Sequence, residues 1–129
     1  MREIKFKVWD KENKKFITSR QGRAHIGIDL NGNVYNLQDG SGGKERYELI
    51  EFTGLKDKSG KEIYGGDICN TRHYTNNFYY IGIVEYSEPC GQWLICQKSP
   101  YELDLRFEEM KEIEIIGNIY ENPELISHS

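Results

Sequence analysis

Turn-forming residues crowd into one stretch, Phe52–Asn70, more densely than elsewhere in the chain, and this stretch constrains the fold most. It overlaps a run of aromatic and aliphatic residues, Tyr47–Leu55, which is typical of a β-strand. Asp57 then begins an Asp-Lys-Ser-Gly turn signal, because its side chain can bond the local backbone and Gly60 accepts a positive φ. The extended pattern resumes directly afterwards. The stretch therefore predicts a β-hairpin with its tip at Lys58–Gly60.

A second turn signal follows at Gly65-Gly66-Asp67, and Ile68–Thr71 then has the composition of a new strand. Glycines allow backbone angles that are strained for other residues. A strand, a tight hairpin, a glycine corner and another strand are typical of a small, strongly bent β-barrel, which needs such corners. The alternative is a ligand-binding loop; we favour the structural corner.

The residues before this stretch predict two further hairpins. Glu3–Trp9 alternates between apolar and polar residues and returns at Phe16–Thr18. His25–Leu30 alternates in the same way and returns at Val34–Leu37. Between them lies Asn31-Gly32, the strongest short hairpin signal, which predicts a type I′ turn with positive φ at both residues.

The composition of the whole chain favours β-strands over helices, because it contains fifteen isoleucines and nine tyrosines but only one alanine. The glycine-rich stretch Gln38–Glu45 predicts a flexible loop or linker. We therefore expect an N-terminal β-hairpin subdomain at residues 1–46 and a β-barrel subdomain at residues 47–129, sharing one core.

Two segments near the C-terminus carry helical signals. Ser99-Pro100 could cap a helix, but Leu103–Phe107 alternates with period two, which favours a strand. Asn122-Pro123-Glu124 predicts a short C-terminal helical turn. The predicted fold class is all-β.

The segment Arg72–Tyr80 predicts a long hairpin loop, with its tip at Thr75–Asn77 and aromatic residues on both sides. Tyrosine is favoured at contact surfaces because it offers a large area, few rotatable bonds and a polar end. The candidate partner surface consists of Arg72, Tyr74, Phe78, Tyr79 and Tyr80. The alternative is that these aromatic side chains fold back on the barrel.

Four residues are possible metal ligands: Cys69, His73, Cys90 and Cys96. They lack the tight pairs typical of zinc sites, and two of the cysteines fall in predicted strands, where they are more simply core residues. We expect no metal and no cofactor. No nucleophile elbow and no identifiable acid–base couple occur, so the sequence does not predict an enzyme.

The formal net charge of −4 and the isoelectric point near 5.4 argue against a broad phosphate-binding face. No apolar run approaches the roughly 20 residues of a membrane span. The opening residues, Met1–Lys5, lack the apolar region of a signal peptide. We expect a cytoplasmic protein, with reduced cysteines and no membrane contact.

Three motifs, at the start, middle and end of the chain, resemble the YopX family of small phage and prophage proteins. They are MREIKFKVWDKENKKFI, TGLKDKSGKEIYGGDI and IIGNIYENPEL. Gly65 departs from the acidic residue expected at its position in that family. The resemblance implies an SH3-like small barrel for residues 47–129 and a phage or prophage origin, and it supplies no catalytic residues.

We expect a phage or prophage accessory protein that acts by protein–protein contact. Its partner would be a host or phage protein, or further copies of the chain in a homo-oligomer. The alternative is a small β-barrel that binds single-stranded nucleic acid, with bases stacked on the aromatic residues of the Arg72–Tyr80 segment.

Overall fold

A computed structural model describes residues 4–17, 26–37 and 40–126. Contacts divide the chain into an N-terminal unit, Glu3–Glu51, and a C-terminal unit that begins at Phe52. The sequence-based boundary at residues 46 and 47 falls at the start of a long strand, whereas the contacts divide within that strand. Each unit is described on its own.

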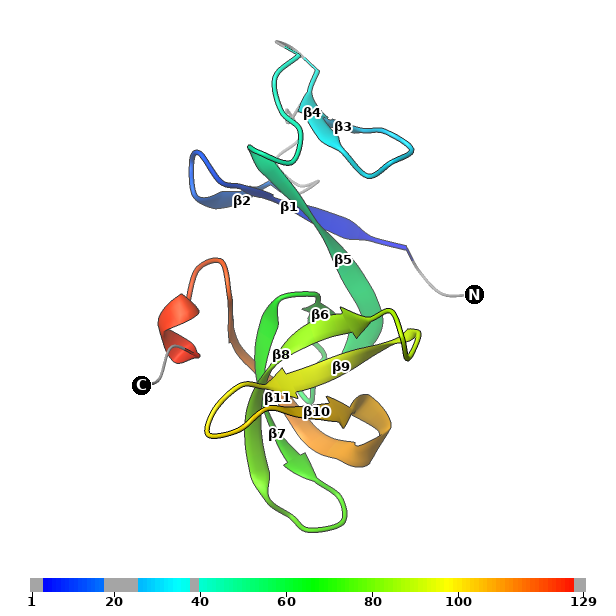
Figure 1. The fold of residues 1–129 in the computed structure, drawn as a ribbon, viewed down its shortest axis with the longest axis vertical. Helices are drawn as coiled ribbons and strands as arrows, with labels where there is room; N and C mark the ends of the chain where they lie inside the picture. Colours follow the sequence, from blue (N-terminus) through cyan, green and yellow to red (C-terminus); the bar gives the residue numbers. More distant parts are fainter. Residues whose placement is uncertain (1–3, 18–25, 38–39, 127–129) are drawn as a thin grey trace. The chain divides into compact units, whose positions relative to one another are not determined.

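The described residues form eleven β-strands and two single turns of 3-10 helix, so the protein is all-β as predicted (Figure 1). In chain order the elements are β1 Phe6–Asp10, β2 Lys15–Ile17, β3 Ile26–Ile28, β4 Val34–Asn36, β5 Tyr47–Lys56, β6 Glu62–Tyr64, β7 Asp67–His73, β8 Tyr79–Ser87, β9 Gln92–Gln97, β10 Leu103–Arg106, η1 Phe107–Glu109, β11 Met110–Asn118 and η2 Pro123–Leu125. No helix among the described residues is long and apolar enough to cross a membrane.

The N-terminal unit contains the two predicted hairpins. Strand β1 pairs in antiparallel fashion with β2 and with the first half of β5, and β3 pairs with β4. Its core consists of Val8, Val34 and Tyr47, each at most 5% exposed. The predicted glycine linker is partly packed against β4, because Gly42 bridges to Tyr35. The residues 18–25 and 38–39 lie outside the described part of the chain.

The turn of the β3–β4 hairpin differs from the predicted type I′ geometry. Gly32 has a φ of 82°, but Asn31 is not among the described residues with positive φ. Instead, Asp29 closes the turn: its Oδ1 accepts the N–H groups of Asn31 and Asn33, both at 2.9 Å. An aspartate two positions before the Asn-Gly signal thus selects a longer loop, in which only the glycine needs the left-handed conformation.

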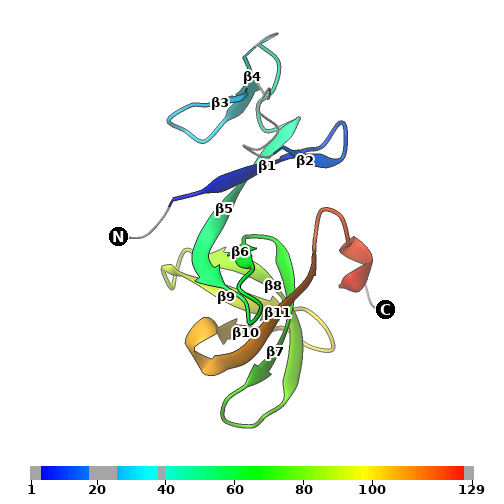
Figure 2. The same ribbon diagram turned by 180° about the vertical axis from the view of Figure 1, so that it is seen from behind.

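The C-terminal unit is a curled five-stranded antiparallel sheet in the order β10-β9-β8-β7-β11, visible from both sides in Figures 1 and 2. The alternation of residues along these strands directs one set of side chains to the inside of the curl. The core lies there and consists of Ile63, Cys69, Tyr80, Val84, Ile95, Leu105 and Met110.

The stretch Phe52–Asn70 forms the hairpin and corner that the sequence predicts. Asp57 Oδ1 accepts the N–H groups of Ser59 and Lys61, both at 2.9 Å, and Gly60 has a φ of 85°. At the corner, Gly66 has a φ of 86°, and a Cβ atom there would lie 2.7 Å from the ring of Tyr120. Both features are structural.

The two ambiguous segments near the C-terminus are also settled. Leu103–Arg106 is strand β10, which confirms the period-two interpretation. The predicted C-terminal helical turn is η2. Asn122 does not cap this turn with its side chain; its Oδ1 accepts the N–H group of Asn118 at 3.2 Å instead. The turn is therefore fastened to the end of β11.

Candidate functional site

The segment predicted as a contact surface is the hairpin between β7 and β8. Arg72 lies opposite Tyr79 and Thr71 opposite Tyr80 in the antiparallel register. The connecting residues Tyr74–Phe78 form the tip, as the polar Thr-Asn-Asn segment predicts. We call these five residues the β7–β8 tip.

Local hydrogen bonds fix the backbone of the β7–β8 tip. His73 donates its N–H to the Phe78 carbonyl at 3.0 Å, and Asn77 donates to the His73 carbonyl at 2.9 Å. Asn77 adopts a φ of 60°, which asparagine tolerates better than most residues. Two side chains accept further N–H groups: His73 Nδ1 from Thr75 at 3.0 Å, and Asn76 Oδ1 from Phe78 at 2.8 Å. The tip is therefore a defined turn.

The tip is also attached to the rest of the C-terminal unit. The Tyr74 N–H donates to the carbonyl of Glu109, at the end of η1, at 3.0 Å. The His73 Nε2 atom lies 3.8 Å from a carboxylate oxygen of the same glutamate. The two contacts hold the backbone of the tip against η1.

Three of the four predicted aromatic residues are exposed: Tyr74 by 61%, Phe78 by 64% and Tyr79 by 65%. Tyr80 is only 9% exposed and belongs to the core, so its placement on a contact surface is corrected. The reason is the alternation along β8, which directs neighbouring residues to opposite faces. The phenol oxygen of Tyr80 still accepts a hydrogen bond from Asn76 at 3.4 Å.

Cations accompany the exposed rings, and one of them, Arg72, also contacts an acidic and a backbone group. The Arg72 guanidinium lies 5.1 Å from the centre of the Tyr79 ring and 3.6 Å from Glu112. Its Nε also donates to the Asn77 carbonyl at 3.3 Å. Lys111 Nζ lies 5.5 Å from the centre of the Tyr74 ring. The surface at the tip is thus aromatic, with one cation beside Tyr74 and another beside Tyr79.

Two hollows lie along β8 and β9. The first, about 410 Å³, is lined by Asn77, Phe78, Tyr79, Tyr80, Gln97, Pro100 and Tyr101. The second, about 230 Å³, is lined by Tyr79, Ile81, Gly82, Cys96, Gln97, Lys98, Ser99, Leu125 and Ile126. We call them the aromatic hollow and the aliphatic hollow.

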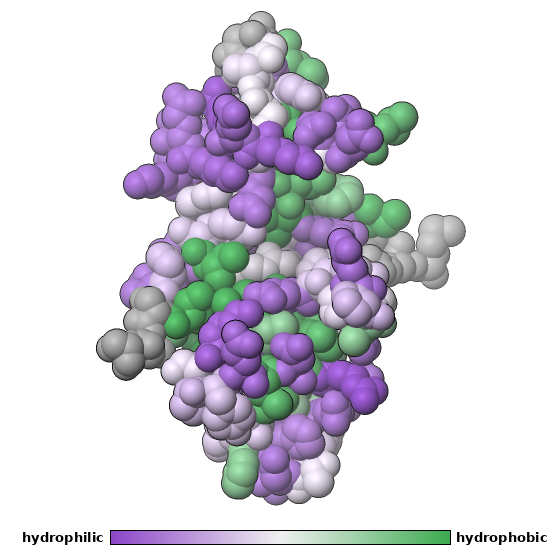
Figure 3. Space-filling view, viewed as in Figure 1, coloured by the Kyte–Doolittle hydropathy of each residue, from purple (hydrophilic) through white to green (hydrophobic). Residues whose placement is uncertain are grey.

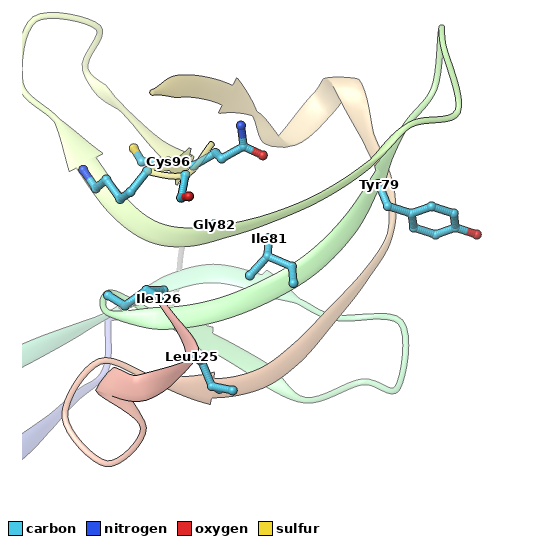
Figure 4. A pocket seen from close by; sticks show the side chains of 9 residues that line it. Tyr79, Ile81, Gly82, Cys96, Leu125 and Ile126 are labelled. Carbon is cyan, nitrogen blue, oxygen red and sulfur yellow. The ribbon is translucent and has the colours of Figure 1, made fainter. Parts of the chain in front are cut away.

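The aliphatic hollow lies between β8 and the C-terminal turn. Figure 4 shows Ile81 on β8, with Leu125 and Ile126 on the turn beside it. Apolar side chains gather on the surface beside this end of the described chain (Figure 3). Sequence reasoning missed the contributions of Tyr101, Leu125 and Ile126, because only the fold brings these distant segments beside β8 and β9.

The possible metal ligands are not assembled into a site. Burial raises the pKa of the Cys69 thiol to about 12, and that of Cys96 also to about 12, where a hydrogen bond with Asp104 adds to the effect. Cys90 is exposed, and all three thiols are free. Within the described residues, no group of three or more His, Cys, Asp or Glu side chains could hold a metal ion. Both buried thiols are protonated core groups.

Comparison with known proteins identifies similar chains. The family model described as "YopX protein" matches residues 5–127. The crystal structure of protein EF1440 from Enterococcus faecalis is 23% identical, with a TM-score of 0.62, over 98% of this chain and 100% of the other. The crystal structure of protein yopX from Bacillus subtilis is 22% identical, with a TM-score of 0.59, over the same shares. No curated protein matches the chain. At these identities the structures establish the shared fold alone.

Proposed function

The chain belongs to the YopX family, and we propose that it acts by protein–protein contact through the β7–β8 tip. The observation that carries this proposal is the exposure of Tyr74 and Phe78 on the hydrogen-bonded tip and of Tyr79 beside it, each above 60%. Exposed aromatic side chains that lie close together often mark a surface for protein–protein contact. A turn that its own hydrogen bonds already hold loses little conformational entropy when a partner binds.

The charge of the C-terminal unit favours a protein partner over a nucleic acid. Residues 52–126 contain thirteen Asp and Glu against seven Lys and Arg. We propose a non-enzymatic accessory protein of a phage or prophage, acting in the bacterial cytoplasm on a host or phage protein or on further copies of itself. The role would need no resident metal or cofactor.

Site-specific photo-crosslinking in cells tests this proposal. A photoreactive benzoyl-phenylalanine replaces Tyr74, which lies at the tip, and in a second strain it replaces Tyr86, which is 49% exposed on the same strand as Tyr79. We expect a discrete covalent adduct from the Tyr74 probe and none from the Tyr86 probe. An adduct of twice the chain's mass would identify self-assembly. Absence of any adduct, or equal adducts from both probes, would contradict the proposal.

A second candidate function, binding of single-stranded nucleic acid, is supported by the cation–ring pairs at the tip. Arg72 with Tyr79 and Lys111 with Tyr74 provide the aromatic and basic groups on which bases stack. However, Arg72 already faces Glu112, and acidic residues prevail in the unit. A gel-shift series with single-stranded oligonucleotides at low salt separates the two candidates: retardation at micromolar protein would favour nucleic acid.

A further inference from the structure

Asn31-Gly32 is the single Asn-Gly pair in the chain, and each of the other eight asparagines is followed by a residue with a side chain. Glycine leaves its backbone nitrogen uncovered, because it has no Cβ atom. This nitrogen can attack the side-chain amide of the preceding asparagine, which then loses ammonia without an enzyme. Asparagine is for this reason among the thermolabile residues of proteins. The pair is therefore the position at which the sequence most favours spontaneous deamidation.

The structure leaves this pair open to water. Asn31 lies in the loop between β3 and β4, and it is exposed. Gly32 has a φ of 82°, and a Cβ atom there would meet only the Leu49 side chain, at 3.9 Å. Neither the attacking nitrogen nor the amide that it would attack is crowded by another segment. Water, which completes the reaction, can reach both.

The Asp29 turn withholds the attacking nitrogen. The Gly32 N–H donates to the Asp29 carbonyl at 3.0 Å. The carboxylate of Asp29 holds the same loop, because its Oδ1 accepts the N–H groups of Asn31 and Asn33, both at 2.9 Å. Attack requires the Gly32 nitrogen to lose its proton and to turn toward the Asn31 Cγ atom, and these bonds oppose both changes. The reaction therefore proceeds from a hairpin that has opened locally.

We propose that Asn31 is a deamidation site and that the Asp29 turn controls its rate. In the open hairpin, the Gly32 nitrogen forms a bond to the Asn31 Cγ atom and the Cγ–Nδ2 bond breaks. The leaving nitrogen departs as ammonia, with the proton from the Gly32 nitrogen. Water then opens the resulting succinimide ring at one of its two C–N bonds, which gives aspartate or isoaspartate. Water is the co-reactant, and the reaction needs no oxidant or reductant.

Either product changes the N-terminal unit. Both add a negative charge to a turn that already contains Asp29, and isoaspartate also adds a methylene group to the main chain. The turn has little room for a longer backbone, because Ile28 and Val34 pair directly beside it. Val34 is only 2% exposed and belongs to the core of this unit. The isoaspartyl chain should therefore unfold at a lower urea concentration than the unmodified chain, and an equal midpoint would contradict this consequence.

Timed incubation of the purified full chain in mildly alkaline buffer, both native and in urea, tests the proposal. Peptide mass spectrometry with separation of aspartyl and isoaspartyl products follows each asparagine. We expect both products to accumulate at Asn31 ahead of every other asparagine, and at least about tenfold faster in urea than in the native chain. This comparison uses the wild type alone, so it remains decisive if a variant does not fold.

Two substitutions of Asp29 test the control by the turn. Asp29→Ala removes the acceptor of two N–H groups and should raise the native deamidation rate about fivefold, because the hairpin opens more often. Asp29→Asn is the matched control: it keeps a side-chain oxygen that accepts N–H groups, so its rate should stay within about twofold of the wild type. It also removes the negative charge, which separates turn closure from an effect of charge on the Gly32 nitrogen. Hydrogen exchange of the Gly32 amide should follow the deamidation rate across the variants.

Several results would overturn the inference: no deamidation of Asn31 in urea, equal rates in urea and in native buffer, or equal rates in wild type and Asp29→Ala. A rise of the same size in both Asp29 variants would assign the effect to charge and overturn control by the turn. The site lies in the N-terminal unit, whereas the proposed contact function rests on the β7–β8 tip in the C-terminal unit. Failure of one proposal therefore leaves the other standing.

Discussion

The hairpin between β5 and β6 and the hairpin between β7 and β8 are each closed by side chains that accept backbone N–H groups. In the first, Asp57 accepts from Ser59 and Lys61. In the second, His73 and Asn76 accept from residues two positions further on. Both turns are therefore specified locally by short polar side chains.

The surfaces of the two hairpins differ. Asp57 is 8% exposed, and its Oδ2 accepts the N–H of Ile115 at 3.1 Å, while the Lys58 N–H donates to the Ile113 carbonyl at 2.8 Å. The first hairpin thus joins β11 and serves the fold. The tip of the second presents Tyr74 and Phe78 to solvent. The difference teaches that a hairpin's role depends on what its tip contacts, even where the local turn chemistry is alike.

The largest effect is expected for Asp57→Ala, which should lower the free energy of unfolding by about 2–3 kcal/mol. The substitution leaves the N–H groups of Ser59, Lys61 and Ile115 without their acceptor, and the last of these lies on another strand. Urea denaturation measures the change.

Asp29→Ala is its matched control. Asp29 also accepts the N–H groups of the residues two and four positions further on, but it lies in an exposed hairpin. We expect Asp29→Ala to lower the free energy of unfolding by about 1 kcal/mol or less. Equal costs at the two aspartates would show that the bond to Ile115 contributes nothing.

Replacing the glycine in each of these two turns should lower the free energy of unfolding by similar amounts. Gly60→Ala and Gly32→Ala both place a Cβ at a φ above 80°. The added atom has no neighbour within 4 Å at Gly60 and only the Leu49 side chain, at 3.9 Å, at Gly32. We expect about 1–2 kcal/mol at each site, from backbone strain alone. Urea denaturation measures the loss in free energy of unfolding. A loss several times larger for Gly60→Ala would show that the backbone conformation of this turn also helps to hold the hairpin against β11.

The contribution of Asp57 should depend on pH. Burial acts to raise the pKa of its carboxyl group, but hydrogen bonds from Ile115, Lys61 and Ser59 outweigh it and hold the pKa below its ordinary value of 3.8. The unfolded chain therefore binds the proton more readily, so the stabilisation is present above pH 3.8 and is lost as the pH falls further. Unfolding measurements from pH 7 downward should show the gap between wild type and Asp57→Asn narrowing below that pH. A constant gap would contradict this role for the carboxylate.

The smallest effect on stability is expected at the β7–β8 tip. Tyr74→Ser and Phe78→Ser remove side chains that are more than 60% exposed, so each should change the free energy of unfolding by about 0.5 kcal/mol or less. Urea denaturation of both variants checks this. A loss near that of Asp57→Ala would mean that these rings support the fold.

The predictable parts of the fold are those that depend on neighbouring residues in sequence. The Asp57 hairpin and the Gly66 corner could be located because aspartate and glycine act within a few residues. The Asn31-Gly32 signal located a hairpin but not its turn type. The turn type differs because the Asp29 side chain accepts the N–H groups of Asn31 and Asn33.

The candidate site was predictable only in part, for a physical reason. The tip follows from the polar segment between aromatic residues, but the burial of Tyr80 depends on which face of β8 meets the core. The aromatic and aliphatic hollows combine β8, the segment around Tyr101 and the turn carrying Leu125. No local pattern specifies that these segments meet.

The proposed contact function is tested most directly by affinity capture from a bacterial lysate, comparing wild type with the Tyr74→Ser/Phe78→Ser double variant and with Tyr86→Ser. We expect a partner that is retained by wild type and by Tyr86→Ser but lost, by about tenfold or more, with the double variant, while its unfolding curve matches the wild type. Undiminished retention of the same partner by a folded double variant would contradict the account.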